Sequence, residues 1–151
     1  MIELETILLA TLPLLDAAAA TVIGATGVVT RNQSVAERME ADDAYWLNLL
    51  DGAPDGPPDA CMGDGYDFTH VARVMIGVRG DSDADRDARF AALVKAINTA
   101  AIADETLGGL VDLMQVQPVE APDAEILDLT VGFKVGELPI LFLYTAPTAA
   151  G

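Results

Sequence analysis

Basic residues are scarce in this chain of 151 residues, where eight Lys and Arg stand against 24 Asp and Glu. The formal net charge is −16, and the few cations form no cluster that could serve as a footprint for phosphates. Direct nucleic-acid binding is therefore disfavoured. Two explanations of the acidity stay open at this point: it keeps the protein soluble, or it creates a field with a function.

Cysteine and long apolar runs are also scarce. The single cysteine, Cys61, cannot form an intramolecular disulfide, and no charged-then-apolar leader is seen, so we expect a reducing compartment and no secretion. The apolar stretch 7–20 is interrupted by Pro13 and Asp16 and falls short of the roughly 20 residues that a membrane span needs. We interpret it as a buried helix and expect no membrane partner.

Hydrophobic residues, by contrast, make up 52% of the chain and charged residues only 21%, which is far from the composition of a disordered protein. A chain of this length buries enough surface to fold without disulfides or metal. We therefore expect one domain over residues 1–151.

The first part of the chain predicts a helix followed by two strands. Pro13 lies inside the helical pattern, so we expect a kink near Thr11 or a break into two short helices. Residues 34–43 are polar and fit a loop or a short helix. The predicted elements are an amphipathic helix over 2–22, a strand over 26–30 and a strand over 44–50 that ends at the turn signal Asp51-Gly52.

Residues 51–67 are dense in Gly, Pro and Asp and predict a long mobile loop. A loop of this length is costly unless it is used, so we expect it to become ordered against a neighbouring subunit or another protein. Deleting 54–63 should then weaken assembly and leave the monomer folded. The candidate assembly residues are Pro54, Gly56, Pro57, Pro58, Gly63 and Gly65.

The second part predicts a central strand, a helix and three further strands. Residues 68–79 alternate regularly with apolar side chains on both faces, which is typical of a central strand. Asp81-Ser82-Asp83 caps a helix that runs to about residue 101. Strands are predicted over 110–119, 126–133 and 138–145, with Gly136-Glu137 as the last turn. The fold class is α+β, a mainly antiparallel or mixed sheet with helices packed on one face.

Each candidate for chemistry lacks a required partner. The run from Asp81 to Asp85 resembles the opening of a calcium loop, but Arg86 stands where the loop needs Gly and Ala92 where it needs Glu. Helix capping is the better interpretation. His70, the only histidine, lies within the strongest strand pattern and suits a structural role, and Cys61 has no histidine beside it in sequence.

Two further patterns have structural interpretations. The glycines around residues 24–27 and 63–65 lack the spacing and the lysine of a phosphate-binding loop and are interpreted as turns. Tyr45 and Trp46 could form an exposed recognition patch, although a place in the core or as a loop anchor is favoured. We therefore expect no catalytic residue, no metal and no cofactor, and a protein that is not an enzyme.

Two phrases of the sequence carry a family resemblance. Asp104-Glu-Thr106-Leu107-Gly108-Gly109 follows the predicted helix, and the terminal strand closes on Tyr144-Thr145. With the order of elements over 68–147, the chain resembles the tail terminator proteins of long-tailed bacteriophages and gene transfer agents. In the folded chain, Asp104 is expected to cap a short turn, Leu107 to enter the core, and the two glycines to let the backbone reverse.

The resemblance implies a structural protein of a virion or virus-like particle, assembled in the cytoplasm of a bacterial host. It implies a homo-oligomeric ring, a hexamer in the family's pattern, that caps the tail tube, ends its polymerisation and joins the tail to the head connector. The implied partners are other copies, the tail tube protein and the connector or neck protein. DNA would pass through the bore without specific binding. Acidic residues lining that bore would repel DNA, so neutralising them would slow genome ejection.

Two alternatives remain open from the sequence. One is another neck or connector protein of the same kind of particle. The other is a small-molecule-binding or enzymatic α+β domain whose site is assembled only in three dimensions, which would show a pocket that gathers His70, Cys61 or carboxylates.

Overall fold

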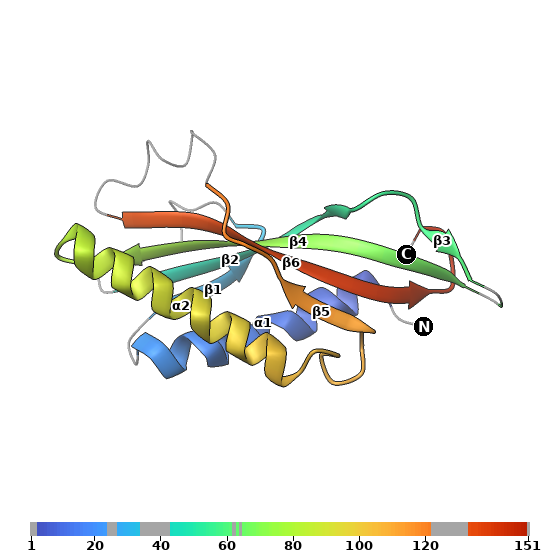
Figure 1. Cartoon of the computed structure of the whole chain (residues 1–151), viewed down its shortest axis with the longest axis horizontal. Coiled ribbons are helices and arrows are strands. Elements are labelled where there is room, and N and C mark those ends of the chain that lie inside the picture. The colour runs from blue at the N-terminus through green and yellow to red at the C-terminus, as the bar shows by residue number, and fades with distance from the viewer. Residues whose placement is uncertain are drawn as a thin grey trace.

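The computed structural model describes residues 3–23, 27–33, 43–61, 63, 65–121 and 133–150. Within them, six strands form one sheet in the order β1-β2-β4-β6-β5, with β3 paired to the start of β4 (Figure 1). The elements are α1 (Leu4–Ile23), β1 (Gly27–Arg31), β2 (Tyr45–Pro54), β3 (Asp59–Ala60), β4 (Tyr66–Arg79), α2 (Asp83–Ala103), β5 (Leu113–Val116) and β6 (Phe133–Ala146).

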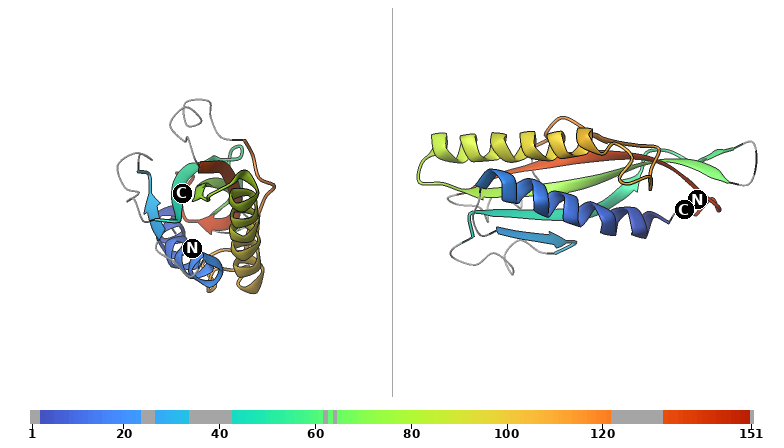
Figure 2. Two further views of the ribbon diagram at one scale, coloured as in Figure 1. Left: turned by 90° about the vertical axis from the view of Figure 1, so that its left-hand side faces the viewer. Right: turned by 90° about the horizontal axis from the view of Figure 1, so that it is seen from below.

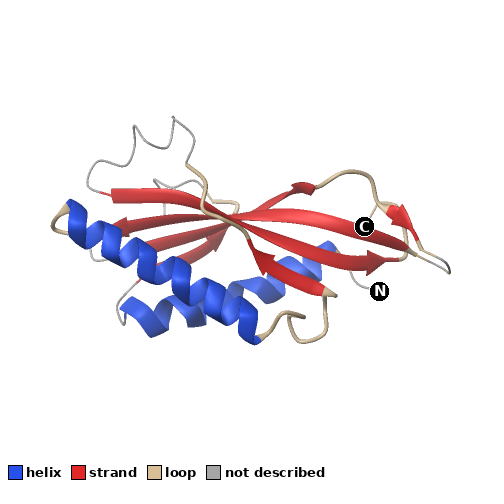
Figure 3. Ribbon diagram, in the orientation of Figure 1, coloured by secondary structure: helices blue, strands red, loops and turns tan. Residues whose placement is uncertain are grey.

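The sheet is mixed, because β1 runs parallel to β2 while every other pairing is antiparallel. Both helices cover the same face of it, as the end-on view in Figure 2 and the colouring in Figure 3 show. The predicted α+β class is therefore confirmed.

Helix α1 is one element of 20 residues with Pro13 inside it, so the predicted break into two helices is wrong. A proline removes the hydrogen bond to the carbonyl four residues earlier, here that of Leu9. Leu9 and Pro13 both lie on the exposed side of the helix, where water can satisfy that carbonyl. The apolar side of the predicted amphipathic helix packs inward, with Ile7, Leu8 and Leu15 fully buried. This packing holds the helix together across the proline.

Strand β2 does not end at the predicted turn of Asp51-Gly52 but continues to Pro54. Its register against β4 shifts between Leu50 and Ala53, which is a β-bulge that absorbs the two residues of the turn signal. Gly52 takes the left-handed φ of +71° that such a bulge requires. The prediction of a structureless loop over 51–67 is therefore wrong: β2, β3 and the start of β4 occupy much of it.

Strand β4 confirms the prediction of a central strand. It lies in the middle of the sheet, between β2 and β6, and extends over 14 residues. Phe68, Ala72 and Val74 alternate along one face of the strand and are buried in the core beneath the helices. On α2, the Ser82 side chain accepts a hydrogen bond from the Asp85 N–H, as the predicted N-cap requires.

Strand β6 runs without interruption through Gly136 and Glu137, so the predicted turn there is wrong. Gly136 faces α2, and a Cβ at this position would meet the Phe90 ring at 2.6 Å. The glycine therefore allows the helix to approach the strand and does not reverse the chain. The strand predicted over 110–119 is present as the shorter β5. The predictions for 34–42 and 126–132 lie outside the described residues.

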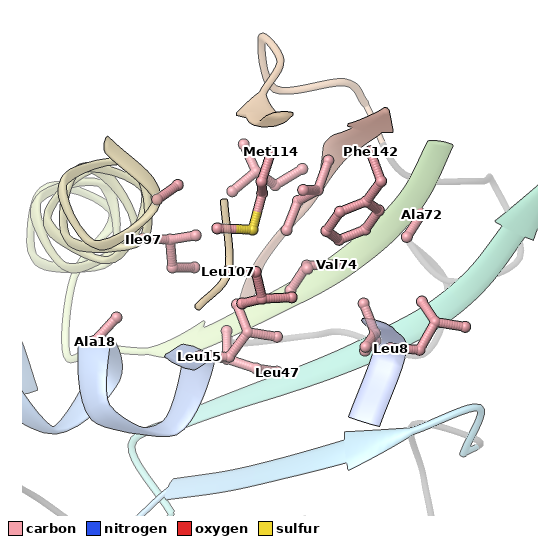
Figure 4. Close-up of a cluster of buried hydrophobic side chains, with 14 of the residues drawn as sticks. Leu8, Leu15, Ala18, Leu47, Ala72, Val74, Ile97, Leu107, Met114 and Phe142 are labelled. Atoms are coloured by element: carbon pink, nitrogen blue, oxygen red, sulfur yellow. The ribbon is translucent and has the colours of Figure 1, made fainter. Parts of the chain in front are cut away.

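The core lies between the sheet and the two helices. In Figure 4, Leu8 and Leu15 of α1 and Ile97 of α2 point toward Leu47 and Val74 of the sheet. Each such side chain contributes about 1.5–3 kcal/mol through burial, so this layer is the main source of stability.

On the opposite face of the sheet, Trp46 is 1% exposed and Asn48 fully buried. Tyr45 is 3% exposed and belongs to the core on the helical side. Successive residues of a strand point to opposite faces, so the two aromatic side chains enter different layers. Both are interior, so the favoured interpretation, a place in the core or as a loop anchor, is confirmed over an exposed recognition patch.

Candidate functional site

The phrase at the end of α2 forms a compact turn that fits the geometry expected from the sequence. The Asp104 carboxylate accepts a hydrogen bond from the Gly108 N–H at 2.9 Å, and the Thr106 hydroxyl accepts one from the Gly109 N–H at 3.2 Å. Gly108 and Gly109 have φ of +68° and +88°. These left-handed conformations suit glycine and turn the chain toward β5.

Leu107 is the side chain through which this turn is anchored. It has a φ of +49°, which costs a residue with a Cβ about 1–2 kcal/mol. Its side chain is only 6% exposed and belongs to the core cluster between sheet and helices. Burial of a leucine offsets the backbone cost, so this side chain holds the turn in place.

The structure brings this turn next to the terminal phrase. The Met114 N–H donates to the Glu105 carbonyl at 2.6 Å, and the Asp112 N–H donates to the Leu143 carbonyl at 2.8 Å. The next residue, Tyr144, is 3% exposed and stacks on Phe68 with ring centroids 5.2 Å apart. Burial raises the pKa of the Tyr144 hydroxyl. The two phrases that carry the resemblance are thus one structural unit.

The described residues of the segment 53–67, which are 53–61, 63 and 65–67, form an arm that extends beyond both helices (Figures 1 and 2). Its strands are joined by the pairing of β3 with β4, and the Asp55 N–H donates to the Thr69 carbonyl at 2.8 Å. The predicted assembly residues lie on it: Pro54, Gly56, Pro57 and Gly63 are exposed, and Pro58 and Gly65 are half-buried. The described residues of the arm pair within the chain's own sheet, and the expectation that the segment becomes ordered against a partner stays a prediction.

Cys61 and His70 are not brought together. The Cys61 thiol is hydrogen-bonded to Asp67 in the arm, and this bond raises the pKa of the thiol. His70 is 2% exposed, and its Nε2 lies in hydrogen-bond contact with the Asp51 carbonyl. The Cys61 N–H pairs with Gly65, which precedes His70 by five residues, or about 16 Å along a strand. That separation is too large for a thiolate and its base.

The run that resembles a calcium loop is engaged in capping and ion pairs. The Asp85 carboxylate accepts from the Asp81 N–H and pairs with Arg89, while Asp83 pairs with Arg86. Among the described residues, no group of three or more His, Cys, Asp or Glu side chains is placed to hold a metal ion.

A network around Arg31 ties the first helix to the bulge of β2 and was not found from the sequence. The guanidinium of Arg31 donates to Glu5 of α1 at 2.8 Å and to Asp51 at 2.7 Å. These hydrogen bonds hold the pKa of both carboxyl groups below the ordinary range. No sequence signal pairs three residues so far apart in the chain.

Replacing Arg31 with Gln should lower stability at pH 7 but not at low pH. The two carboxyl groups have depressed pKa values in the folded state, so their stabilisation is present above the unfolded pKa of about 4 and is lost as pH falls through the folded values. Urea midpoints should therefore differ at pH 7 and converge toward pH 2. Lys134→Gln removes the same charge from a single ion pair with the exposed Asp87 and should show a much smaller difference. Curves for Arg31→Gln that stay parallel to wild type would contradict this account.

Two grooves of about 570 Å³ each were also missed from the sequence. One lies on the sheet face opposite the helices, where Arg73 pairs with Glu120 and Glu137. Strand alternation alone could have placed Arg73 and Glu137 on that face. The other groove lies between α1 and α2 and is almost wholly apolar. Neither groove is lined by His70 or Cys61. The described residues that line the first groove are Ala53, Pro54, Asp55, Val71, Arg73, Gln117, Pro118, Val119, Glu120, Pro139 and Leu141. Those that line the second are Leu14, Ala17, Ala18, Thr21, Val22, Ala92, Lys95, Ala96, Thr99, Ala100 and Ala103.

The helix α1 meets the length and composition of a membrane span. Over Leu4–Val22 its mean hydropathy is 1.4, and 33% of this apolar stretch is buried. The sequence interpretation that this stretch is too short is therefore wrong on those criteria. Its inner side nevertheless packs into the core through Ile7, Leu8 and Leu15, as a core helix does.

Comparison with known proteins gives neither a family model that matches this sequence nor a curated protein similar to it.

Proposed function

We propose that the chain is a structural protein that forms a ring on the end of a phage-like tail tube, stops tube polymerisation and joins the tail to the head connector. What supports the proposal is the single unit made by the Asp104 to Gly109 turn and the strand that ends at Tyr144-Thr145. These are the residues through which the sequence resembles tail terminators, and their contacts give each of them a structural task.

The surface also suits a protein that assembles. The sheet is open, so the described strands β1 and β5 lie at its two edges, and edge strands are natural places for association. The arm extends away from the body and is largely exposed. Other copies, the tail tube protein and a connector or neck protein are the proposed partners, with DNA passing through the bore unbound.

Particles made without this protein provide the test of function. Tubes should grow past their normal length and fail to join heads, because nothing would cap their ends. Supplying the wild-type chain should restore normal length, whereas a destabilised variant should not. Normal tails on heads that leak DNA would instead indicate another connector component, and unchanged particles would refute the proposal.

A further inference from the structure

The groove between α1 and α2 is unusual for a chain of net charge −16, since its described lining contains no carboxylate. The two helices run side by side over the sheet (Figure 2), and the groove is lined by residues of both of them. Small side chains, among them Ala17, Ala96 and Ala100, keep the helices close and leave the groove open to another chain.

Lys95 is the charged residue of this groove, and it has no ion pair among the described residues. The structure gives ion pairs to Arg31, Arg73, Arg86, Arg89 and Lys134. Positions one helical turn from Lys95 hold Ala91, Ala92, Asn98 and Thr99, so no carboxylate of its own helix can reach it there. An exposed cation is thus left available on a protein that has three times as many acidic as basic residues.

Apolar surface continues around the groove. Only 33% of the apolar stretch within Leu4–Val22 of α1 is buried by this chain. Leu9 and Val22 of α1 are 51% and 38% exposed, and Ile102 of α2 is 62% exposed. A helix that is apolar on both sides is normally covered on both sides. The sheet covers one side of α1, so the other is suited to a partner.

The arm has the complementary chemistry. It carries Asp55, Asp59 and Asp67 and no Lys or Arg over 53–67, and its exposed prolines and alanines offer apolar contact. The arm extends past the ends of both helices (Figures 1 and 2), whereas the groove is lined by residues within α1 and α2 and by none of the arm. Contact between arm and groove therefore requires two copies.

We propose that the arm of one copy docks in the α1–α2 groove of the next copy, with an arm aspartate paired to Lys95. This inference rests on the proposed ring and names the surfaces that build it. Such a contact joins two different surfaces and is therefore heterologous, and contacts of this type generate closed rings when the rotation permits. A membrane is disfavoured as the occupant, because anionic lipid surfaces repel a chain of this charge.

Cysteine cross-linking tests the contact directly, because the native Cys61 lies in the arm. Thr99→Cys places a second thiol in the groove, while Ala84→Cys places one on the same helix outside it. A short bis-maleimide should join Thr99→Cys copies into a ladder that reaches the full ring, at least about tenfold more efficiently than the Ala84→Cys control, because docking raises the local thiol concentration. Dimers alone, or equal yields, would overturn the inference.

Charge reversal tests the pairing at Lys95. Lys95→Glu should weaken ring association at least about tenfold by placing like charges together, and combining it with Asp59→Lys should recover much of the loss. Circular dichroism checks that each variant is folded. If Lys95→Glu forms normal rings and Thr99→Cys gives no cross-links, the arm–groove contact is refuted. The proposed ring would not be refuted by that result. A wild-type chain that never associates, or that instead floats with phosphatidylcholine vesicles, would overturn both.

Discussion

Gly52→Ala is expected to destabilise the protein by about 3 kcal/mol or more, because the backbone at this position leaves no room for a side chain. A Cβ on residue 52 would lie 1.8 Å from the Val71 carbonyl oxygen, and the φ of +71° is unfavourable for alanine in any case. The atoms in the way belong to the central strand and cannot move aside as a flexible side chain would. The bulge that starts the arm would have to reorganise. Urea unfolding measures the loss.

Gly56→Ala is the matched control within the arm. Its φ of +85° carries the same conformational penalty, but a Cβ there would meet nothing within 4 Å. A loss of about 1–2 kcal/mol is therefore expected from the backbone alone. Equal losses for the two variants would show that crowding against Val71 does not matter and would contradict the role given to the bulge.

Leu107→Ala should cost about 2–5 kcal/mol, because it removes a buried leucine and leaves a cavity beneath the turn. The Leu107 side chain is only 6% exposed, and the free energy of its burial offsets the conformational cost of the φ of +49° at this residue. Near-ultraviolet circular dichroism would report on the packing of buried aromatic side chains such as Tyr144, and chemical unfolding would measure the free energy of unfolding.

Ile102→Ala provides the comparison for Leu107. Ile102 is 62% exposed and lies five residues earlier, so its truncation should change stability by no more than about 0.5 kcal/mol. A loss below 1 kcal/mol for Leu107→Ala would mean that the turn is held by its hydrogen bonds and not by burial.

The sequence predicts those parts of the fold in which local pattern and tertiary packing agree. Alternation along β4 and the Ser82 cap of α2 are examples, because the burial of one face and the capping of the first turn are local requirements. The Asp104 to Gly109 turn belongs to the same class, since its hydrogen bonds join residues three or four apart.

The wrong predictions come from breaker residues that tertiary contacts redirect. Gly52 and Gly136 were interpreted as turns, but one serves a bulge and the other admits the Phe90 ring. Pro13 was expected to kink α1 or break it into two helices, but the helix is not broken, and the lost hydrogen bond lies on the solvent side. Whether a glycine reverses a chain or accommodates a neighbour depends on residues far away in sequence, and a single sequence does not contain that information.

The candidate assembly surfaces were predictable only in part. The unusual composition of 51–67 singled out the arm, although its sheet pairing was missed. The groove could not be found, and neither could the absence of an ion pair to Lys95 within the part of the chain that the structure describes. Both depend on how α1 packs beside α2 and on which carboxylates stay out of reach.

The mass and symmetry of the assembled protein test the central claim most directly. Like-charged copies repel, and at about 0.1 M salt this repulsion is screened beyond about 10 Å. Native mass spectrometry with electron microscopy, on samples assembled at low and moderate salt, should show one closed ring of defined copy number that becomes more populated as salt is raised. A protein that stays monomeric at every salt and protein concentration, and does not join tail tubes, would contradict the account.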